Sequence, residues 1–157
     1  MTTTIYYIQV ATAIGEVWVS ECDGAITAVS FTAPVSGFYR ETALLARAAK
    51  QLTEYFQGVR RSFDLPFAPQ GTAFQHKVWQ TLLAIPYGET CTYKEVARRI
   101  GVPGGSRAVG MACNRNPIAV IVPCHRVVGC GRRLVGYAYG VELKRFLLQL
   151  ELKTHLF

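Results

Sequence analysis

The sequence predicts an α+β protein, with a small N-terminal lobe of antiparallel sheet plus helix and a mostly α-helical C-terminal lobe. Three observations predict this class. Residues 5–31 alternate between apolar and polar side chains in the manner of strands, whereas residues 74–151 contain apolar stripes at helical spacing. Between them, Pro66, Pro69 and Gly71 interrupt an extended stretch that is typical of a connector. We therefore expect a structural domain over residues 1–70 and a functional domain over residues 71–157.

Composition limits the class of protein. The chain has 157 residues, of which 50% are hydrophobic, so it can bury a sizeable core. No apolar run approaches the roughly 18 residues of a membrane span, and the first residues lack the features of a signal peptide, which together predict a cytoplasmic protein with no membrane partner. The five cysteines form no C-x-x-C pair, so reduced thiols are expected rather than a disulfide framework or a zinc ribbon.

The N-terminal elements follow from alternation and turn chemistry. Strands are expected over residues 5–10, 16–20 and 25–31, with Asp23-Gly24 as the hairpin turn because glycine accepts a positive φ. Residues 34–39 are expected to form a loop. A helix then follows over residues 44–56.

The C-terminal lobe begins with an amphipathic helix over residues 74–83. Thr92 and Glu95 form a capping box that starts a second helix, which Gly101 ends. A third helix runs through residues 106–113, so the second and third form a helix-turn-helix.

This helix-turn-helix is a candidate for DNA docking. Arg107 lies two residues before Val109, about 200° around the helix axis, so it points outward if Val109 packs inward. Two short helices joined by glycine are also common in proteins that do not bind DNA.

Residues 118–122 form an apolar run that is expected to be a short buried strand, ended by Pro123. Cys124 then lies at the end of a core element, where desolvation disfavours the thiolate. Nucleophilic use of this thiol would need a base such as His125. The alternative is a structural Cys–His pair.

The last helix has an apolar stripe with Glu151 on its margin, about 40° from Leu147. Its partner is either a nearby arginine or solvent, or His125, which it would orient and keep basic. Before this helix, Tyr137 and Tyr139 lie in a glycine-framed loop that either walls a pocket for a planar ligand or is an ordinary turn. The stripe consists of Leu143, Phe146, Leu147 and Leu150.

The net charge of +7 is unevenly distributed. Residues 1–65 hold five basic and six acidic side chains, whereas residues 66–157 hold twelve basic and four acidic ones, a net charge of +8. Most of these cations are arginines, which bind phosphate in a planar fork. The charge indicates either a nucleic-acid partner or a basic protein without a polyanionic ligand.

Five motifs follow one another along the second lobe: Gly71-Thr72-Ala73-Phe74-Gln75, Ile85-Pro86-Tyr87-Gly88-Glu89-Thr90, Ser106-Arg107-Ala108-Val109-Gly110, Asn116-Pro117-Ile118 and Pro123-Cys124-His125-Arg126-Val127. With these motifs, the chain resembles the bacterial members of the O6-alkylguanine-DNA alkyltransferases, also called methylated-DNA–protein-cysteine methyltransferases. The resemblance is strongest over residues 71–151 and weaker in the N-terminal lobe, for which it implies a ribonuclease H-like ridge.

The resemblance implies a set of catalytic roles. Cys124 would accept the alkyl group from O6 of guanine, and His125, acting through a water, would take the thiol proton. Glu151 would polarise the histidine and Asn116 would brace the active-site turn. Tyr93 would protonate the departing guanine, whose negative charge otherwise develops in a poorly solvated pocket.

The resemblance also implies base flipping through the minor groove. Arg107 would fill the gap left in the base stack, and the small residues after it would let the helix enter the groove. The implied DNA-binding residues are Arg107, Tyr93, Ala108, Gly110 and Arg115. The implied base pocket consists of Val127, Tyr137, Ala138 and Tyr139.

The implied product is a thioether on the protein, so each molecule would act once, as a monomer, on double-stranded DNA that contains O6-alkylguanine. No cofactor and no metal are expected, and O4-alkylthymine is left open as a substrate. The family often has serine and glycine where this chain has Ala138 and Tyr139, so methyl adducts are expected to react better than benzyl adducts.

Two other functions remain open at this stage. An alkyltransferase-like protein binds lesions without chemistry, but another residue replaces the cysteine in such proteins. A Cys–His hydrolase would form an acyl-enzyme and release it with water. Turnover separates the hydrolase, which releases many products, from an alkyltransferase, which stops at about one.

Overall fold

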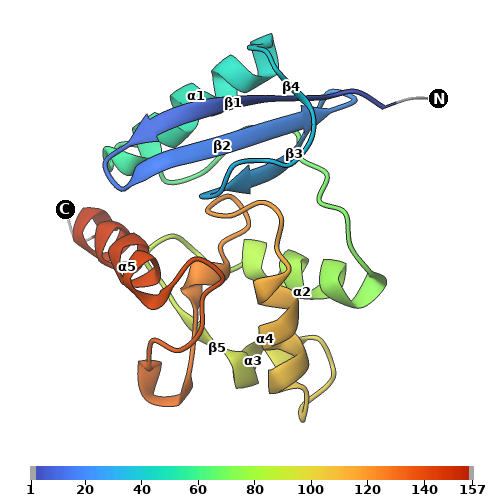
Figure 1. Ribbon diagram of the computed structural model, residues 1–157. Coiled ribbons are helices and arrows are strands. Elements are labelled where there is room, and N and C mark those ends of the chain that lie inside the picture. The colour runs from blue at the N-terminus through green and yellow to red at the C-terminus, as the bar shows by residue number, and fades with distance from the viewer. Residues whose placement is uncertain (1–2, 156–157) are drawn as a thin grey trace. The chain divides into compact units, whose positions relative to one another are not determined.

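The computed structural model describes the backbone of residues 3–155 and separates them into two compact units (Figure 1). The N-terminal unit comprises the described residues up to Gln70 together with Pro117–Ile121. The C-terminal unit comprises Gly71–Asn116 and the described residues from Val122 onward. The assignment of a structural role to one lobe and of the chemistry to the other stays a prediction.

The N-terminal unit is a four-stranded sheet with one helix on one face, as predicted for the α+β class (Figure 1). The sheet order is β3-β2-β1-β4, and β1, β2 and β3 are antiparallel. The expected hairpin turn is confirmed, because Asp23 and Gly24 have φ of 52° and 78°. The elements are β1 (Ile5–Thr12), β2 (Gly15–Cys22), β3 (Ala25–Ser30), β4 (Phe38–Tyr39) and α1 (Ala43–Phe56).

The core of this unit lies between α1 and the sheet. Alternate residues of the strands, such as Val17 and Val19, are fully buried and face apolar residues of the helix, such as Leu45 and Leu52. Alternation along strands and a 3.6-residue period along the helix produce these two complementary faces. The expected loop over residues 34–39 contains a short strand, β4, which pairs in parallel with β1.

The C-terminal unit is built on helices, and its first three pack on one another (Figure 1). Thr72 and Thr92 cap α2 and α3 through their side chains, and Gly101, with φ of 82°, ends the turn after α3. The indole of Trp79 donates to the Ala112 carbonyl at 3.0 Å and ties α2 to α4. The elements are α2 (Ala73–Leu83), β5 (Cys91–Thr92), α3 (Tyr93–Arg99), α4 (Ser106–Asn114), β6 (Val127–Val128) and α5 (Val141–His155).

The prediction of a buried strand before Cys124 is wrong: residues 118–122 are buried but do not form a strand. All of residues 118–122 are buried, but Ile118 makes only an isolated bridge with Val29 and the chain then turns, with Val120 at φ of 71°. A positive φ is rare for a β-branched residue and stops the ladder at one pair. An apolar run indicates burial, whereas a strand also needs a continuous partner.

No helix among residues 3–155 is both long and apolar enough to cross a membrane.

Candidate active site

Cys124 begins a short 3-10 turn, Cys124–Arg126, and is 5% exposed. Burial raises the pKa of its thiol, while a hydrogen bond from Asn116 and the positive charge of Lys144 oppose this shift. The Asn116 amide donates to Sγ at 3.3 Å and to the Val122 carbonyl at 2.8 Å. Asn116 therefore links the Cys124 sulfur to the turn before it, and burial favours the neutral thiol over the thiolate.

His125 follows directly in the same turn and is fully buried. Its Nε2 lies 2.7 Å from Oε2 of Glu151, so the structure brings the two residues together. Nδ1 is buried and has no hydrogen-bond partner among the described residues. If the neutral ring carries its proton on Nε2 and donates it to Glu151, Nδ1 presents a lone pair that can accept a proton.

Glu151 has a second partner, Arg126, so the structure contains both the arginine contact and the His125 contact that the sequence left open as alternatives. The guanidinium donates to both carboxylate oxygens, at 2.8 and 3.0 Å, and to the Ile85 carbonyl at 2.8 Å. Arg126 and His125 hold the pKa of the Glu151 carboxyl well below its usual range in spite of its burial. The only feature of the sequence that could have pointed to this contact is that Arg126 directly follows His125.

The buried face of the last helix is rotated by part of a turn from the apolar face that the sequence predicted. The described residues of α5 that are classed as buried are Lys144, Leu147 and Glu151, whereas Leu143 and Phe146 are only partly buried. Glu151 therefore lies on the buried face rather than on its margin. An apolar stripe could not reveal this face, because two of its three residues are charged.

Tyr93 is the first residue of α3, and its hydroxyl donates to the Val135 carbonyl at 3.1 Å. Lys144 Nζ donates to this hydroxyl at 3.3 Å and to the carbonyls of Val135 and Gly136 at 3.1 and 2.9 Å. Burial and the neighbouring thiols of Cys113 and Cys124 raise the pKa of Tyr93 to about 12. The Tyr93 hydroxyl is therefore protonated at neutral pH.

The residues expected to form a base pocket differ in exposure. Val127 is buried in β6, which pairs with β5, while Ala138 is exposed in the loop before α5. Tyr137 and Tyr139 are partly buried, with ring centroids 5.8 Å apart in an edge-to-face pair. The Tyr137 hydroxyl is buried, and desolvation together with the Cys124 thiol raises its pKa. Tyr137 therefore lies close to Cys124.

Four of the expected DNA-binding residues lie in α4 or at its C-terminal cap, and the fifth, Tyr93, begins α3. Arg107 and Ala108 are exposed, as is Arg115 at the C-terminal cap, while Val109 is fully buried, which is the condition under which the sequence placed Arg107 on the outside. Gly110 lies about 60° from Arg107 around the axis and is partly buried, with the Tyr93 ring as its neighbour. This helix face therefore ends beside the candidate proton donor.

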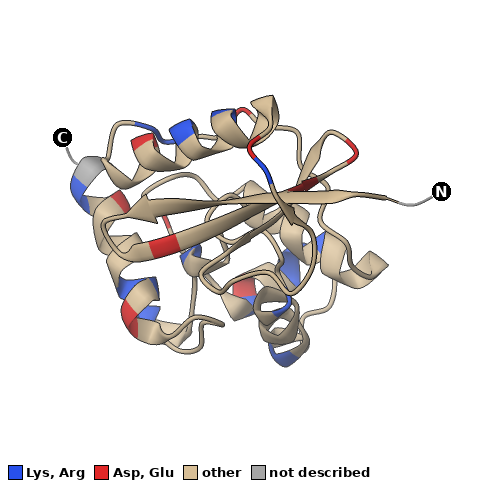
Figure 2. Cartoon of the chain, turned by 45° about the horizontal axis from the view of Figure 1, so that its top comes forward, with Lys and Arg blue, Asp and Glu red and all other residues tan. Residues whose placement is uncertain are grey.

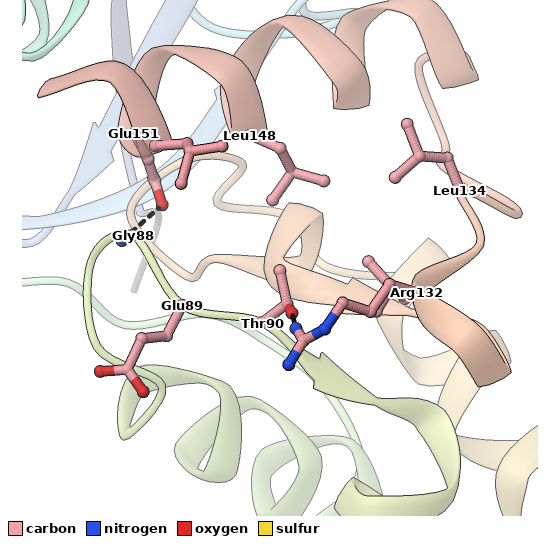
Figure 3. Close-up of a pocket in the computed structure, with 9 residues that line it drawn as sticks. Gly88, Glu89, Thr90, Arg132, Leu134, Leu148 and Glu151 are labelled. Carbon is pink, nitrogen blue, oxygen red and sulfur yellow. Dashed lines mark hydrogen bonds between the residues drawn. The ribbon is translucent and has the colours of Figure 1, made fainter. Parts of the chain in front are cut away.

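A cavity of about 420 Å³ is lined by Glu151 but not by Cys124. Figure 3 shows Glu151 at its edge, accepting from the Gly88 amide at 3.4 Å, with Leu134 and Leu148 around it and Arg132 bound to the Thr90 hydroxyl. In the described part of the chain no group of three or more histidine, cysteine or acidic side chains could hold a metal ion.

Comparisons with known proteins agree along the whole chain. The family model for the DNA-binding domain of 6-O-methylguanine DNA methyltransferase matches residues 73–153, and the model for its ribonuclease-like domain matches residues 5–69. A methylated-DNA–protein-cysteine methyltransferase of Methanosarcina acetivorans is 57% identical over 114 residues, which cover 73% of this chain and 69% of the relative. The constitutive enzyme of Bacillus subtilis is 43% identical over 156 residues, which cover 93% of this chain and 94% of the relative.

A solved structure is similar over nearly the same length. The crystal structure of Mycobacterium tuberculosis OGT in complex with DNA has a TM-score of 0.88 to this chain and 41% sequence identity, and the match covers 95% of this chain and 94% of that one. The fold and the sequence therefore indicate one family.

Proposed function

Because the chain belongs to the 6-O-methylguanine DNA methyltransferase family, we propose that it repairs DNA by moving the alkyl group from O6 of guanine to its own Cys124. One observation supports this assignment above the others: Cys124 is braced by Asn116 and is followed directly by His125, which is paired with Glu151 inside the protein. The product is a thioether, which water does not cleave, so each molecule acts once.

In the proposed reaction, His125 takes the thiol proton through a water molecule at Nδ1, the ring nitrogen with no protein partner among the described residues. The sulfur then attacks the alkyl carbon in line with the C–O6 bond. That bond breaks and its electron pair moves into the purine. Tyr93 gives its proton to the departing base, and Glu151 stabilises the imidazolium that has formed.

The target atom lies inside the duplex, so we propose that the lesion is flipped out of the stack. The exposed face of α4 enters the minor groove and Arg107 occupies the gap, while Ala108 and Gly110 allow close approach. Arg115 contacts the DNA backbone. The extruded guanine is then held by backbone groups near Val127, by Tyr137 and by the Ala138 amide.

Double-stranded DNA containing O6-alkylguanine is the proposed substrate. We further propose that the protein acts as a cytoplasmic monomer without cofactor or metal, that residues 1–70 are structural and that residues 71–157 carry the chemistry.

The reaction is tested by intact mass after mixing with a duplex that contains O6-methylguanine. We expect a gain of one methyl group in the wild type and in Cys130→Ser, which removes an exposed thiol, but not in Cys124→Ser. Unmodified protein together with restored DNA would indicate a hydrolytic reaction instead. The absence of any reaction would contradict the proposal.

Tyr139 adds a ring to the rim of the proposed pocket, where its edge meets Tyr137. We expect methylated guanine to react faster than benzylated guanine, and Tyr139→Gly to raise the benzyl rate more than the methyl rate. Single-turnover rates for the two adducts measure this preference. Equal or faster benzyl transfer by the wild type would refute it.

A further inference from the structure

Lys144 is a buried cation to which the proposed reaction assigns no role. Its side chain lies on the inner face of α5 and is fully buried. An ammonium group has three N–H donors, and three acceptors surround this one: two loop carbonyls, of Val135 and Gly136, and the Tyr93 hydroxyl. Its hydrogen-bonding capacity is therefore used in full.

The charge of this group is nevertheless uncompensated. Within the part of the chain that the structure describes, no carboxylate lies within ion-pair distance of Lys144 Nζ. Burying an unpaired charge costs several kcal/mol, and an apolar residue of similar volume would fill the same space without that cost. A lysine here is therefore poorly explained by packing alone.

The ammonium faces the groups on which negative charge would develop. Nζ lies 3.3 Å from the Tyr93 oxygen and 5.5 Å from the centroid of its ring. The neighbouring Cys124 and Cys113 thiols also interact with it electrostatically. The two loop carbonyls hold the ammonium in place, so its position relative to the tyrosine is fixed by the backbone of the loop as well as by the lysine side chain.

On the basis of the proposed alkyl transfer, we propose that Lys144 is a positioning residue that holds the Tyr93 hydroxyl and polarises it for proton donation to the departing guanine. Lys144 donates one N–H to the tyrosine oxygen, so the tyrosine proton must point elsewhere. In the free protein it points to the Val135 carbonyl. In the complex it points to the base.

The charge balance of the step explains why a cation is needed. The electron pair of the broken C–O6 bond enters the purine, and the tyrosine proton bonds to a ring nitrogen of that base. Negative charge therefore grows on the tyrosine oxygen as its proton leaves. An ammonium at hydrogen-bond distance in a buried site stabilises this charge far more than water would.

A double-mutant cycle on the rate of methyl transfer from duplex DNA tests this role. We expect Lys144→Met to slow transfer at least about tenfold in the wild type, but less than about threefold in Tyr93→Phe, which has no proton to donate. Lys153→Met, which removes an exposed lysine from the same helix, is the matched control and should leave the rate unchanged.

As controls for correct folding, the thermal unfolding of each variant and its affinity for undamaged duplex DNA are measured. If Lys144→Met fails to fold, Lys144→Gln replaces it, because the amide keeps donors for the carbonyls and removes the charge. Equal losses in the two backgrounds would show that Lys144 only holds the loop and would overturn the inference. If the wild type itself gains no methyl group, the proposed function fails instead, so the two failures are distinguishable.

Discussion

At the scale of single residues, the Cys124 thiol lies among charged groups that are kept in a buried environment. The thiol itself is disfavoured as an anion by its burial. Around it lie a histidine held by Glu151 and a lysine held by loop carbonyls. Substitutions of these partners should therefore change stability as well as rate.

Glu151→Gln should destabilise the protein strongly. The substitution removes the charge that compensates the buried Arg126, and breaking a buried pair on one side costs about 3–5 kcal/mol. Glu142→Gln is the matched control, because its pair with Arg145 on the same helix is exposed and should be worth less than about 1 kcal/mol. Denaturant unfolding of both variants measures the difference. Similar losses would contradict the importance of the buried network.

The pH dependence of alkyl transfer should follow His125. Burial lowers the pKa of this imidazole below its ordinary value of 6.5, and Glu151 opposes the shift. The base form therefore persists to a pH below 6.5, and the transfer rate should begin to fall only in that range. Single-turnover rates between about pH 5 and about pH 8 measure this limb.

Removing Glu151 should move the acid limb further down the pH scale, because the carboxylate is the group that raises the pKa of His125. A limb at higher pH in Glu151→Gln would contradict this prediction. The lowered pKa of His125 in the folded chain also makes the stability of the wild type depend on pH. The folded chain binds the proton more weakly than the unfolded chain, so the contribution of His125 is present above pH 6.5 and is lost as the pH falls through the folded pKa.

At the scale of elements, α4 has one buried face and one exposed face, and the exposed face is the one proposed to contact DNA. The buried face carries Val109 and the exposed face carries Arg107, which lies two residues away and therefore about 200° around the helix axis. A glycine in the interior of this helix weakens it by about 0.5–1 kcal/mol relative to alanine, so Gly110 needs a reason other than helix stability.

Gly110→Ala should raise stability and weaken DNA binding. The added Cβ would lie 3.8 Å from the Tyr93 ring, an ordinary contact, so nothing within the protein excludes a side chain here. We expect a gain of about 0.5–1 kcal/mol in the free energy of unfolding, together with a lower affinity for duplex DNA because the methyl group obstructs the minor groove. Thermal unfolding and fluorescence anisotropy measure the two effects. Unchanged affinity would contradict the proposed groove contact.

At the scale of the whole molecule, positive charge is concentrated in one part of the sequence. The three long strands carry no lysine or arginine (Figure 2). In the sequence, basic residues are concentrated after residue 65. DNA binding through these residues releases counterions, so affinity should fall steeply as salt rises.

Arg115→Gln should reduce the slope of log affinity against log salt by about 0.9 if this arginine neutralises one phosphate. Lys50→Gln is the control, since it removes an equally exposed cation from α1 of the other unit. It should leave the slope unchanged. Equal changes in both variants would indicate non-specific electrostatics without a defined binding face.

The sequence alone was sufficient for the features that depend on local rules. Alternation, turn residues and caps predicted β1–β3 and all five helices, because these patterns act over a few residues. The same reasoning made residues 118–122 a strand, since periodicity detects burial and not the presence of a partner strand. Motifs in order along the chain predicted the family, which the comparisons confirm.

Only the tertiary structure decided which charged groups meet. Arg126 contacts Glu151 across 25 positions of sequence, and Lys144 contacts Tyr93 across 51. Such contacts depend on how α5 is rotated about its axis. The apolar stripe predicted the wrong rotation, because the charged residues Lys144 and Glu151 lie on the buried face. Buried ionic contacts are set by long-range packing and leave no periodic trace in the sequence.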